Sequence, residues 1–471
     1  MSIRFEQLSF AYGEDRKDTI SQFDAEFQTD RITVLTGPSG CGKSTLLYLA
    51  AGIYPHNAGL LRSGKVTIDG QNPAALPPQQ RCALVGMMFQ NPELQFCMDT
   101  VRNELIFCLE NIQTPIEYME EKIHAALSFC EILHLEHRTL QSLSGGERQK
   151  VMLACLSALN PKWLLLDEPF ANIDEESACS IARKLQEMHA RLGTGILVVD
   201  HRLDYWVGIA DSIRIFSDGH LLDESPDPQR PDSAQLERLG VIAPGVPYHP
   251  QLSPCSPGET ALVLQNLRLK HGENEILKDV NAVFRRGCIY AIVGKSGCGK
   301  SSLFGALSGL YSYEGAVLLM GKNIRSLKKR DIGTIGFVTQ SPQDQFVGGT
   351  VHQEILLSLR GQSNASEESK AILQRIRLWA YRDVSPYILS QGQQRRLGVA
   401  ALLSYPCRVL ICDEPTYAQD RANTLELMQG LCTAAREQNI ALIFSTHDRR
   451  LAESYADENF ELKGGVLHEI H

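Results

Sequence analysis

Two glycine-rich loops of the pattern G-x-x-x-x-G-K-[ST] constrain the fold of this chain more than any other feature. The first runs from Gly37 to Thr45 and the second from Gly294 to Ser302. Each follows an apolar stretch that predicts a buried strand, and the first precedes a stretch that predicts a helix. Backbone amides in such a turn, together with the helix N-terminus, can hold an anion. Both loops are therefore predicted to bind phosphate groups.

The two loops supply most of the candidate nucleotide-binding residues. Lys43 and Lys300 are predicted to reach the β- and γ-phosphates, and Ser44 and Ser301 to hold Mg²⁺. The candidate loop residues are Gly37, Pro38, Ser39, Gly40, Cys41, Gly42, Lys43, Ser44, Thr45, Gly294, Lys295, Ser296, Gly297, Cys298, Gly299, Lys300, Ser301 and Ser302.

Other features of the chain are duplicated along with the loops. The loop lysines lie 257 positions apart (300 − 43). Three further pairs lie 246 positions apart: Ser144 and Ser390, Asp167 and Asp413, His201 and His447. This spacing is far above the roughly 20–50 residues of a solenoid repeat, so it indicates a duplicated domain.

The predicted fold class is α/β, with two domains in tandem. Strand-like runs alternate with helical ones in both copies. The segment 225–260 is rich in Pro, Ser and Asp, which predicts a linker with one helical turn near 235–239. We therefore predict a first domain at 1–228, a linker at 229–259 and a second domain at 260–471.

Composition narrows the classes of function. The net charge of −9 argues against nucleic acid as the main partner, because a protein that binds nucleic acid usually has a basic surface. No apolar run reaches the roughly 18 residues of a membrane span, and the first residues lack the apolar core of a signal peptide. The 13 cysteines include no C-x-x-C pair, so disulfides and metal–thiolate sites are not expected. A cytosolic location is expected unless a partner holds the protein at a membrane.

Two apolar strands are predicted to end in carboxylate pairs, at Asp167–Glu168 and Asp413–Glu414. The aspartates suit Mg²⁺ through its hydration shell. The glutamates suit a proton acceptor that orients the attacking water. For either pair taken alone, the alternative is an ordinary carboxylate pair on a loop, without a chemical role. The shared spacing of 23 residues past the serine (167 − 144; 413 − 390) favours the chemical role.

The sequence LSGGERQ at 143–149 resembles the signature motif of ATP-binding-cassette (ABC) ATPases, and LSQGQQR at 389–395 is a variant of it. The order of phosphate loop, glutamine, signature, acidic strand end and histidine occurs twice, and the resemblance covers both halves. It implies two P-loop NTPase domains with ATP and Mg²⁺ as cofactors. Each would have a mixed-sheet core, an antiparallel β subdomain and a helical signature subdomain.

The resemblance assigns further roles. Gln90 and Gln340 would contact Mg²⁺ or the water, and His201 and His447 the γ-phosphate. The expected catalytic residues are Glu168, Glu414, His201, His447, Gln90 and Gln340. The expected metal-site residues are Ser44, Asp167, Gln90, Ser301, Asp413 and Gln340.

The resemblance also predicts adenine and inter-cassette contacts. Tyr12 would stack on adenine, and His271 takes its place in the second copy; a plain surface position is the alternative for both. In the family the signature residues meet the nucleotide of the opposite cassette, so the halves would close head to tail as an internal pseudo-dimer. The signature candidates are Ser144, Gly145, Gly146, Ser390, Gln391 and Gly392. Asp174 and Asp420 occupy the D-loop position at the expected dimer seam.

Departures from the signature pattern predict two unequal sites. Gln391 stands where the first copy has Gly145, and Gln393 where it has Glu147. A side chain at a position where bare backbone approaches phosphate is expected to hinder closure.

A second frame, Q-x-P-x-x-Q-F followed by T-V-x-x-E, occurs at 90–104 and 340–354. It resembles the region of energy-coupling-factor (ECF) and cobalt-type importers that docks coupling helices. The implied partners are a transmembrane coupling protein and a separate substrate-binding membrane component, for vitamin or transition-metal-ion uptake. The implied location is peripheral, at the cytoplasmic face of a bacterial membrane. Phe96 and Phe346 are expected to be exposed contacts in the grooves 92–101 and 342–351; core positions are the alternative.

Two other functions stay open on the sequence. Soluble twin-cassette ATPases that act on ribosomes also lack a membrane span, although they carry a longer charged helical arm. A sugar or peptide importer subunit is the other alternative.

Overall fold

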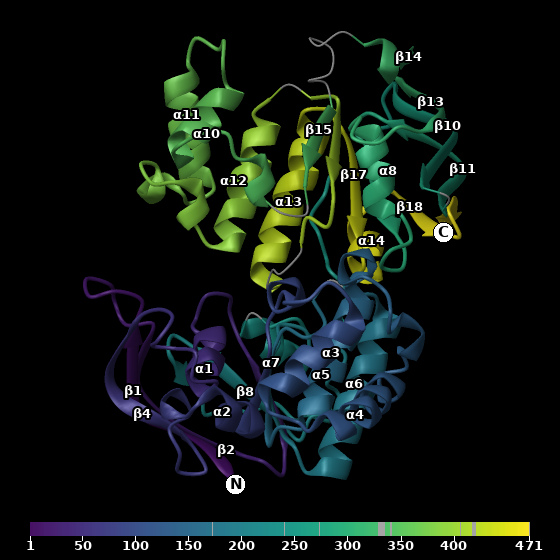
Figure 1. The fold of residues 1–471 in the computed structure, drawn as a ribbon. Helices are drawn as coiled ribbons and strands as arrows, with labels where there is room; N and C mark the ends of the chain where they lie inside the picture. Colours follow the sequence, from purple (N-terminus) through teal and green to yellow (C-terminus); the bar gives the residue numbers. More distant parts are fainter. Residues whose placement is uncertain are drawn as a thin grey trace. The chain divides into compact units, whose positions relative to one another are not determined.

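The computed structural model describes residues 1–171, 173–239, 241–272, 274–327, 335–339, 342–405, 407–416 and 421–470. It divides into two compact units, Met1–Val246 and Pro247–His471. The division falls inside the predicted linker, whose helix α7 (Ser233–Arg238) occupies the position of the predicted helical turn. Figure 1 shows the same set of layers in each unit.

The core of the first unit is a six-stranded sheet. Its order is β5-β6-β7-β3-β8-β9, and all neighbours are parallel except β8 and β9. Every residue of β3, β6 and β7 is buried, as expected for central strands covered on both faces. The strands are β3 (Ile32–Thr36), β5 (Val85–Met88), β6 (Trp163–Asp167), β7 (Gly195–Val199), β8 (Ser212–Ser217) and β9 (His220–Leu221). The carboxyl ends of the parallel strands meet at one edge of the sheet.

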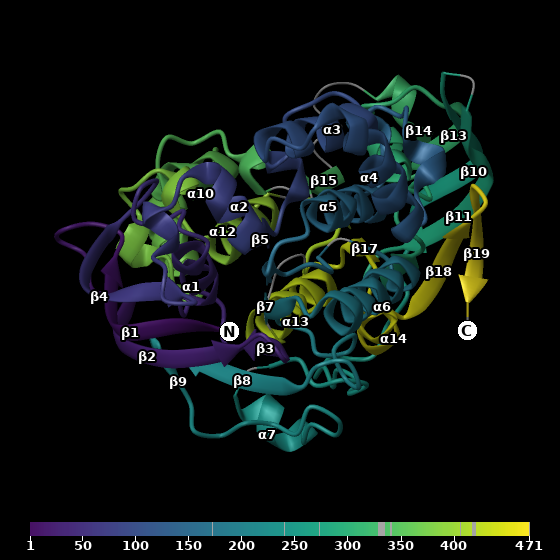
Figure 2. The same ribbon diagram turned by 60° about the horizontal axis from the view of Figure 1, so that its bottom comes forward.

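A separate antiparallel sheet, in the order β2-β1-β4, forms the second layer. Its strands are β1 (Ser2–Ala11), β2 (Ile20–Gln28) and β4 (Leu60–Ile68). Helix α1 (Lys43–Ala50) contacts β4 as well as β6 and β7 (Figure 2). Leu46, Leu47 and Leu49 of α1 share one apolar core with both sheets. The helix that follows the first phosphate loop is thus fixed between two sheets.

A helical subdomain completes the first unit. Helix α5 contacts α3, α4 and α6, and together they surround a second apolar core. The helices are α2 (Pro78–Leu84), α3 (Val101–Asn111), α4 (Ile116–Phe129), α5 (Gly145–Leu159) and α6 (Glu175–Leu192). Helix α4 ends at Phe129, and a 3₁₀ turn follows at Leu133–Leu135.

The second unit repeats this topology. Its core sheet has the order β15-β16-β17-β12-β18-β19 and its antiparallel sheet the order β11-β10-β13-β14. The core strands are β12 (Ile289–Val293), β15 (Ile335–Val338), β16 (Val409–Cys412), β17 (Ala441–Thr446), β18 (Glu458–Lys463) and β19 (Val466–Ile470). The antiparallel strands are β10 (Thr260–His271), β11 (Asn274–Arg285), β13 (Glu314–Leu319) and β14 (Lys322–Asn323). The identical order of the core strands confirms the duplication inferred from the spacing, although the second antiparallel sheet has a fourth strand, β14.

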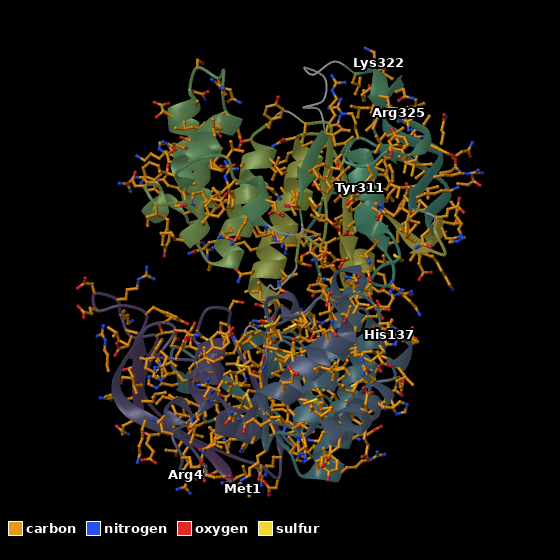
Figure 3. All side chains as sticks on the ribbon, in the orientation of Figure 1. Met1, Arg4, His137, Tyr311, Lys322 and Arg325 are labelled. Atoms are coloured by element: carbon orange, nitrogen blue, oxygen red, sulfur yellow. The ribbon has the colours of Figure 1, made fainter. Side chains whose placement is uncertain are left out.

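The helices of the second unit are α8 (Lys300–Leu307), α10 (Val351–Ser358), α11 (Ala365–Arg375), α12 (Gln391–Leu403), α13 (Arg421–Glu437) and α14 (Arg449–Tyr455). Figure 3 shows Lys322 and Arg325 close together beyond β13, at one end of the antiparallel sheet. The Arg325 guanidinium lies 4.0 Å from the Tyr313 ring centroid there. In the described part of the chain, no helix has the length and apolar character needed to cross a membrane.

Candidate active sites

The first phosphate loop has the backbone that its glycines predict. Gly37 has a φ of 143°, and a Cβ there would lie 2.1 Å from the Phe216 carbonyl oxygen. Gly42, at φ 107°, begins helix α1. Lys43 is buried, and its ammonium donates to the carbonyl oxygens of Gly37 (2.9 Å) and Pro38 (2.7 Å). The loop therefore curls around a lysine at a helix N-terminus, which is a phosphate-binding geometry.

The second loop repeats the first. Gly299 begins α8 with a φ of 107°. Lys300 is buried and donates to the carbonyl oxygens of Gly294 (2.7 Å) and Lys295 (3.2 Å). The second unit thus has its own phosphate loop of the same shape.

Asp167 ends strand β6 directly beside the first loop. The Ser44 hydroxyl donates to its Oδ1 at 2.9 Å and the Tyr48 hydroxyl to its Oδ2 at 3.3 Å. Burial and the charge of Glu168 raise the pKa of Asp167 to about 7. A nearby cation would favour the charged form of this carboxylate. Two adjacent oxygen-bearing side chains at the loop fit the oxygen ligands that Mg²⁺ requires.

Glu168 is held in an unusual conformation between two partners. Its φ of 47° lies in the left-handed region, which costs free energy for a residue that carries a side chain. His201 Nε2 lies 3.0 Å from its Oε1, and Gln90 Nε2 donates to its Oε2 at 2.8 Å. Burial opposes ionisation of Glu168, but His201, Lys43 and Gln90 outweigh burial and hold its pKa below the usual value. Sequence reasoning selected all these residues, and the fold brings them together.

The second site places its glutamate and histidine in the same way. Glu414 has a φ of 48°, and His447 Nε2 lies 2.9 Å from its Oε1. Its backbone amide donates to Ser445 Oγ at 2.9 Å, whereas the Glu168 amide donates to a backbone carbonyl at 2.8 Å. Ser445 also donates to Asp413 at 2.6 Å. The sequence analysis missed Ser445. Gln340 lies outside the described residues.

The two candidate adenine-stacking residues differ in their contacts. Tyr12 is 42% exposed, and its hydroxyl lies 2.8 Å from Thr45 Oγ1 in α1, so the ring is beside the phosphate loop. His271 is also exposed, and its ring meets the edge of Tyr311 with centroids 4.9 Å apart. The Tyr12 ring also contacts the rings of Phe10 and Tyr54, and its exposed part next to the loop fits a stacked base.

Both signature serines act as helix N-caps. Ser144 and Glu147 form a reciprocal capping box at the start of α5. Ser390 and Gln393 form the same box at the start of α12, because a glutamine oxygen can accept the N-cap amide as a carboxylate does. The replacement of Glu147 by Gln393 therefore leaves the local fold intact. The side chain of Gln391 lies outside the described residues.

The remaining signature and D-loop residues show why α5 needs small residues. A Cβ at Gly146 would lie 2.6 Å from Ser177 Oγ, so α5 and α6 approach too closely for a side chain. Asp174 caps α6 by accepting from the Ser177 amide at 3.0 Å. Asp420 lies outside the described residues.

The T-V-x-x-E frame has a structural role that the sequence did not reveal. Glu104 is buried, and its Oε2 accepts the backbone amides of Cys97 (2.9 Å) and Met98 (2.8 Å). Glu354 accepts the amides of Val347 (2.9 Å) and Gly348 (2.6 Å) in the same way. The glutamate thus fixes the loop that follows each Q-x-P-x-x-Q-F frame.

The expectation of two exposed phenylalanines is wrong. Phe346 is 9% exposed and belongs to an apolar core of the second unit. Phe96 is half-buried and packs against the helical core of the first unit. The most exposed apolar side chains of these segments are instead Leu94 (80% exposed) and Val347 (83% exposed). Helices α5 and α12 cover the two phenylalanines and leave Leu94 and Val347 exposed, and the order of the sequence cannot show this packing.

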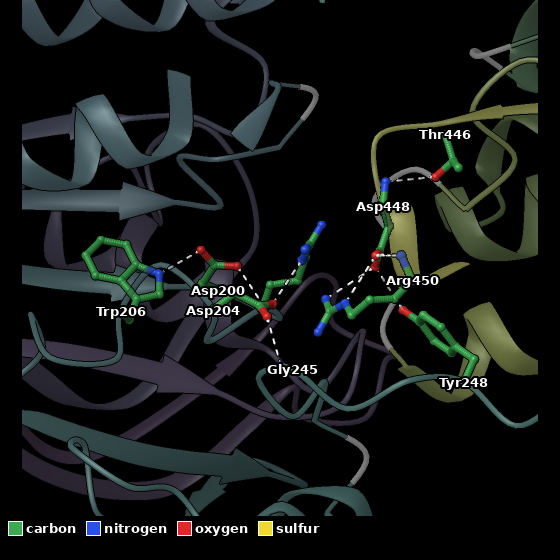
Figure 4. A network of polar contacts seen from close by, with 9 residues as sticks. Asp200, Asp204, Trp206, Gly245, Tyr248, Thr446, Asp448 and Arg450 are labelled. Carbon is green, nitrogen blue, oxygen red and sulfur yellow. Dashed lines mark hydrogen bonds and ion pairs between the residues drawn. The ribbon is translucent and has the colours of Figure 1, made fainter. Parts of the chain in front are cut away.

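Asp200, directly before His201, is a buried support that the sequence analysis passed over. It accepts the Trp206 indole N–H at 2.8 Å and the Arg202 amide at 2.9 Å (Figure 4). Burial raises its pKa to about 6. Three residues after His201, Asp204 accepts the amide of Gly245 at 3.3 Å. The last residues of the first unit therefore support the loop that carries His201, here called the histidine loop.

Asp448, directly after His447, has a comparable place in the second unit. Its Oδ2 accepts the hydroxyl of Tyr248 at 3.3 Å, and its amide donates to Thr446 Oγ1 at 3.1 Å. Tyr248 is buried, and the Arg421 guanidinium lies 5.2 Å from its ring centroid. Residues of the predicted linker thus contact the histidine loop in each unit.

These folds and sites define a tandem P-loop nucleoside triphosphatase. A family model described as ABC transporter matches residues 20–171 and 277–417. The chain belongs to this family, as an ATP-binding protein with two cassettes in tandem that hydrolyses ATP.

Known proteins resemble the chain over nearly its whole length. A Bacillus subtilis (strain 168) protein, YkoD, named provisionally as an HMP/thiamine import ATP-binding protein, is 34% identical over 96% of this chain and 88% of its own. A Methanosarcina mazei protein, also provisionally named as an ABC transporter ATP-binding protein, is 27% identical over 99% of this chain and 88% of its own.

Among solved structures, the archaeal ribosome recycling factor aABCE1 in complex with ribosomal stalk protein aP1 matches with a TM-score of 0.66. The match has 19% identity and covers 98% of this chain and 90% of that one. At this identity the likeness concerns the fold alone.

Asp200 predicts a pH dependence of stability. Its folded pKa of about 6 lies above the roughly 3.9 of an unperturbed aspartate, so the fold favours its protonated form. The stabilisation is present below about pH 4 and lost as pH rises through about 6. Asp200→Asn removes this titration. Its unfolding free energy relative to the native sequence should therefore rise by about 3 kcal/mol between pH 4 and 7, or less where the cavity relaxes.

The measurement is denaturant unfolding of the full chain at several pH values, followed by Trp fluorescence. Asp30→Asn, at an exposed position, is the matched control and should give a constant difference. A constant difference for Asp200→Asn as well would contradict the prediction.

Proposed function

We propose that this protein energises a membrane importer of the energy-coupling-factor type, for a vitamin or a transition-metal ion. The observation that carries the proposal is the duplicated Q-x-P-x-x-Q-F frame, braced in both cassettes by a buried glutamate, Glu104 or Glu354. The relative named for HMP/thiamine import supports the same function. The partners would be a transmembrane coupling protein and a separate substrate-binding membrane component, with the cassettes peripheral to the cytoplasmic face.

The catalytic step follows from the residues at each loop. In the first cassette, Lys43 and the loop amides hold the β- and γ-phosphates. Ser44 and Asp167 would hold Mg²⁺, which would supply a positive charge that neutralises phosphate charge. Glu168 is ionised and accepts a proton from, or orients, the attacking water. His201 and Gln90 fix the Glu168 carboxylate.

In the second cassette the same roles fall to Lys300, Ser301, Asp413, Glu414 and His447. Burial raises the pKa of Asp413, as it does that of Asp167. A cation beside either carboxylate would favour its charged form. We further propose that each nucleotide is completed by the signature of the opposite cassette, head to tail. Two amide-rich helix N-termini, at Ser144 and Ser390, then face the γ-phosphates.

The first test of this mechanism replaces both proposed catalytic glutamates. Glu168→Gln with Glu414→Gln should keep ATP binding and lower hydrolysis by about 10²–10⁴-fold, the usual range for a lost general base. Phosphate release measures turnover, and nucleotide titration measures binding. Glu147→Gln is the matched control, because the second cassette has glutamine at that position and keeps its capping box. Near-normal turnover in the double variant would refute the assignment.

The two sites are predicted to contribute unequally. The Glu414 site would be completed by LSGGE and the Glu168 site by LSQGQ, where Gln391 replaces a glycine. Glu414→Gln should therefore lower ATPase activity more than Glu168→Gln. Adding Gln391→Gly should bring the two single variants closer together. Equal losses, unchanged by Gln391→Gly, would show that the glutamine is harmless.

The partner surface is predicted to include the exposed Leu94 and Val347. Leu94→Asp with Val347→Asp should leave the isolated protein folded and active, because both side chains face solvent. Co-purification with a small hydrophobic membrane protein, and solute uptake, should be lost. Ile116→Asp, at an 86% exposed position outside the frame, is the matched control.

A double variant that still co-purifies with the membrane partner would refute this surface. Recovery of ribosomes in place of a membrane protein with the native sequence would refute the importer function and support the ribosomal alternative.

A further inference from the structure

The second cassette contains a cavity that the ATPase function does not use. It has a volume of about 540 Å³ and lies among the end of α10, α11, α12 and α13. Its floor is apolar and buried, with Ile372, Val399, Leu427 and Leu431. None of the described residues that line it belongs to the phosphate loop or to the Q-x-P-x-x-Q-F frame. Its volume falls within the roughly 300–1,000 Å³ of small-molecule sites.

Two small residues on α13 create this space. Gly430 and Ala434 lie one turn apart and both line the cavity. A Cβ at Gly430 would meet nothing within 4 Å. Glycine is unfavourable in a helix interior, so Gly430 does not stabilise α13.

The corresponding space of the first cassette is partly filled. Lys184 stands 17 residues past Asp167, as Gly430 stands 17 past Asp413 (184 − 167; 430 − 413). The Lys184 ammonium lies 5.0 Å from the Phe129 ring centroid and 3.1 Å from a Glu131 carboxylate oxygen. A smaller hollow of about 370 Å³ remains nearby, lined by Met188. The large cavity is thus a property of the second cassette.

Two arginines line the cavity, Arg375 and Arg396, and Arg396 is the less exposed of the two. This side chain is half-buried, and its Nη1 donates to Asn423 Oδ1 at 3.0 Å. Its Nε is buried and has no hydrogen-bond partner among the described residues. Glu368 and Glu426 also line the cavity, and within the described ranges neither forms an ion pair with Arg396.

The buried Nε of Arg396 is the group that selects a ligand. Arg375 and Glu426 are exposed, so water and salt screen their charges, while Arg396 and Glu368 are both half-buried, so charge alone does not decide the preference. A buried donor without an acceptor costs free energy, so an acceptor placed beside the Arg396 Nε is stabilised. The cavity therefore offers an apolar floor and an unsatisfied guanidinium donor.

We propose that this cavity binds a small apolar organic anion, with its apolar body on the floor and its carboxylate or sulfonate at Arg396. The occupant would contact the last turns of α12, whose first residue follows the signature Ser390, and the middle of α13. The site is independent of the proposed transport function.

The test uses the full chain with saturating ADP and Mg²⁺, titrated with the fluorescent anion 8-anilinonaphthalene-1-sulfonate. One saturable site per chain is expected. Gly430→Leu should lower its affinity at least tenfold, because the new side chain occupies the cavity. Arg396→Gln should lower the affinity for this anion about tenfold but leave that for the uncharged N-phenyl-1-naphthylamine unchanged.

Ala422→Leu, at an exposed position of α13 outside the cavity, is the matched control and should bind the anion normally. Thermal unfolding and ATPase activity verify that each variant is folded; should Gly430→Leu fail, Gly430→Ala should give a smaller loss of affinity in the same direction. Unchanged binding in the folded Gly430 variants would overturn the site. Equal losses for both probes in Arg396→Gln would overturn the preference for an anion.

Discussion

The contact between Glu168 and His201 is the interaction on which the site depends. It joins the ends of β6 and β7, which are neighbours in the parallel sheet. Parallel strands end at the same edge, so two loops 33 residues apart in sequence (201 − 168) meet there. The left-handed backbone at Glu168 turns its carboxylate toward the phosphate loop after β3, the other neighbour of β7. The buried sheet beneath keeps this strained residue in place.

The buried polar groups around this contact are satisfied by local partners. Asp200 is held by Trp206 and the Arg202 amide, and Asp167 by Ser44 and Tyr48. An unpaired carboxylate in such surroundings would cost free energy, so these partners fix the histidine loop and strand end. The site is therefore preorganised by the fold rather than by any single side chain.

Because the cassette is duplicated, equivalent positions of its two copies can be compared within one chain. The capping boxes of Ser144 and Ser390 survive a change from glutamate to glutamine, because either side chain can accept the same amide. The change from Lys184 to Gly430 has no such equivalence, because glycine cannot fill the volume of a lysine. The contact between glutamate and histidine is present in both halves, while packing behind the signature helix has diverged.

The sequence by itself determined the buried strands, the phosphate loops, the carboxylate pairs and the duplication. These features follow from local rules: apolar periodicity, glycine backbone freedom and fixed spacing. Only the tertiary structure decided that Phe346 is core while Val347 is exposed, because neighbouring residues differ only in what packs over them. It also revealed that Glu104 holds two loop amides and that Gly430 opens a cavity. Both depend on elements that folding alone brings together, and no local pattern in the sequence encodes that proximity.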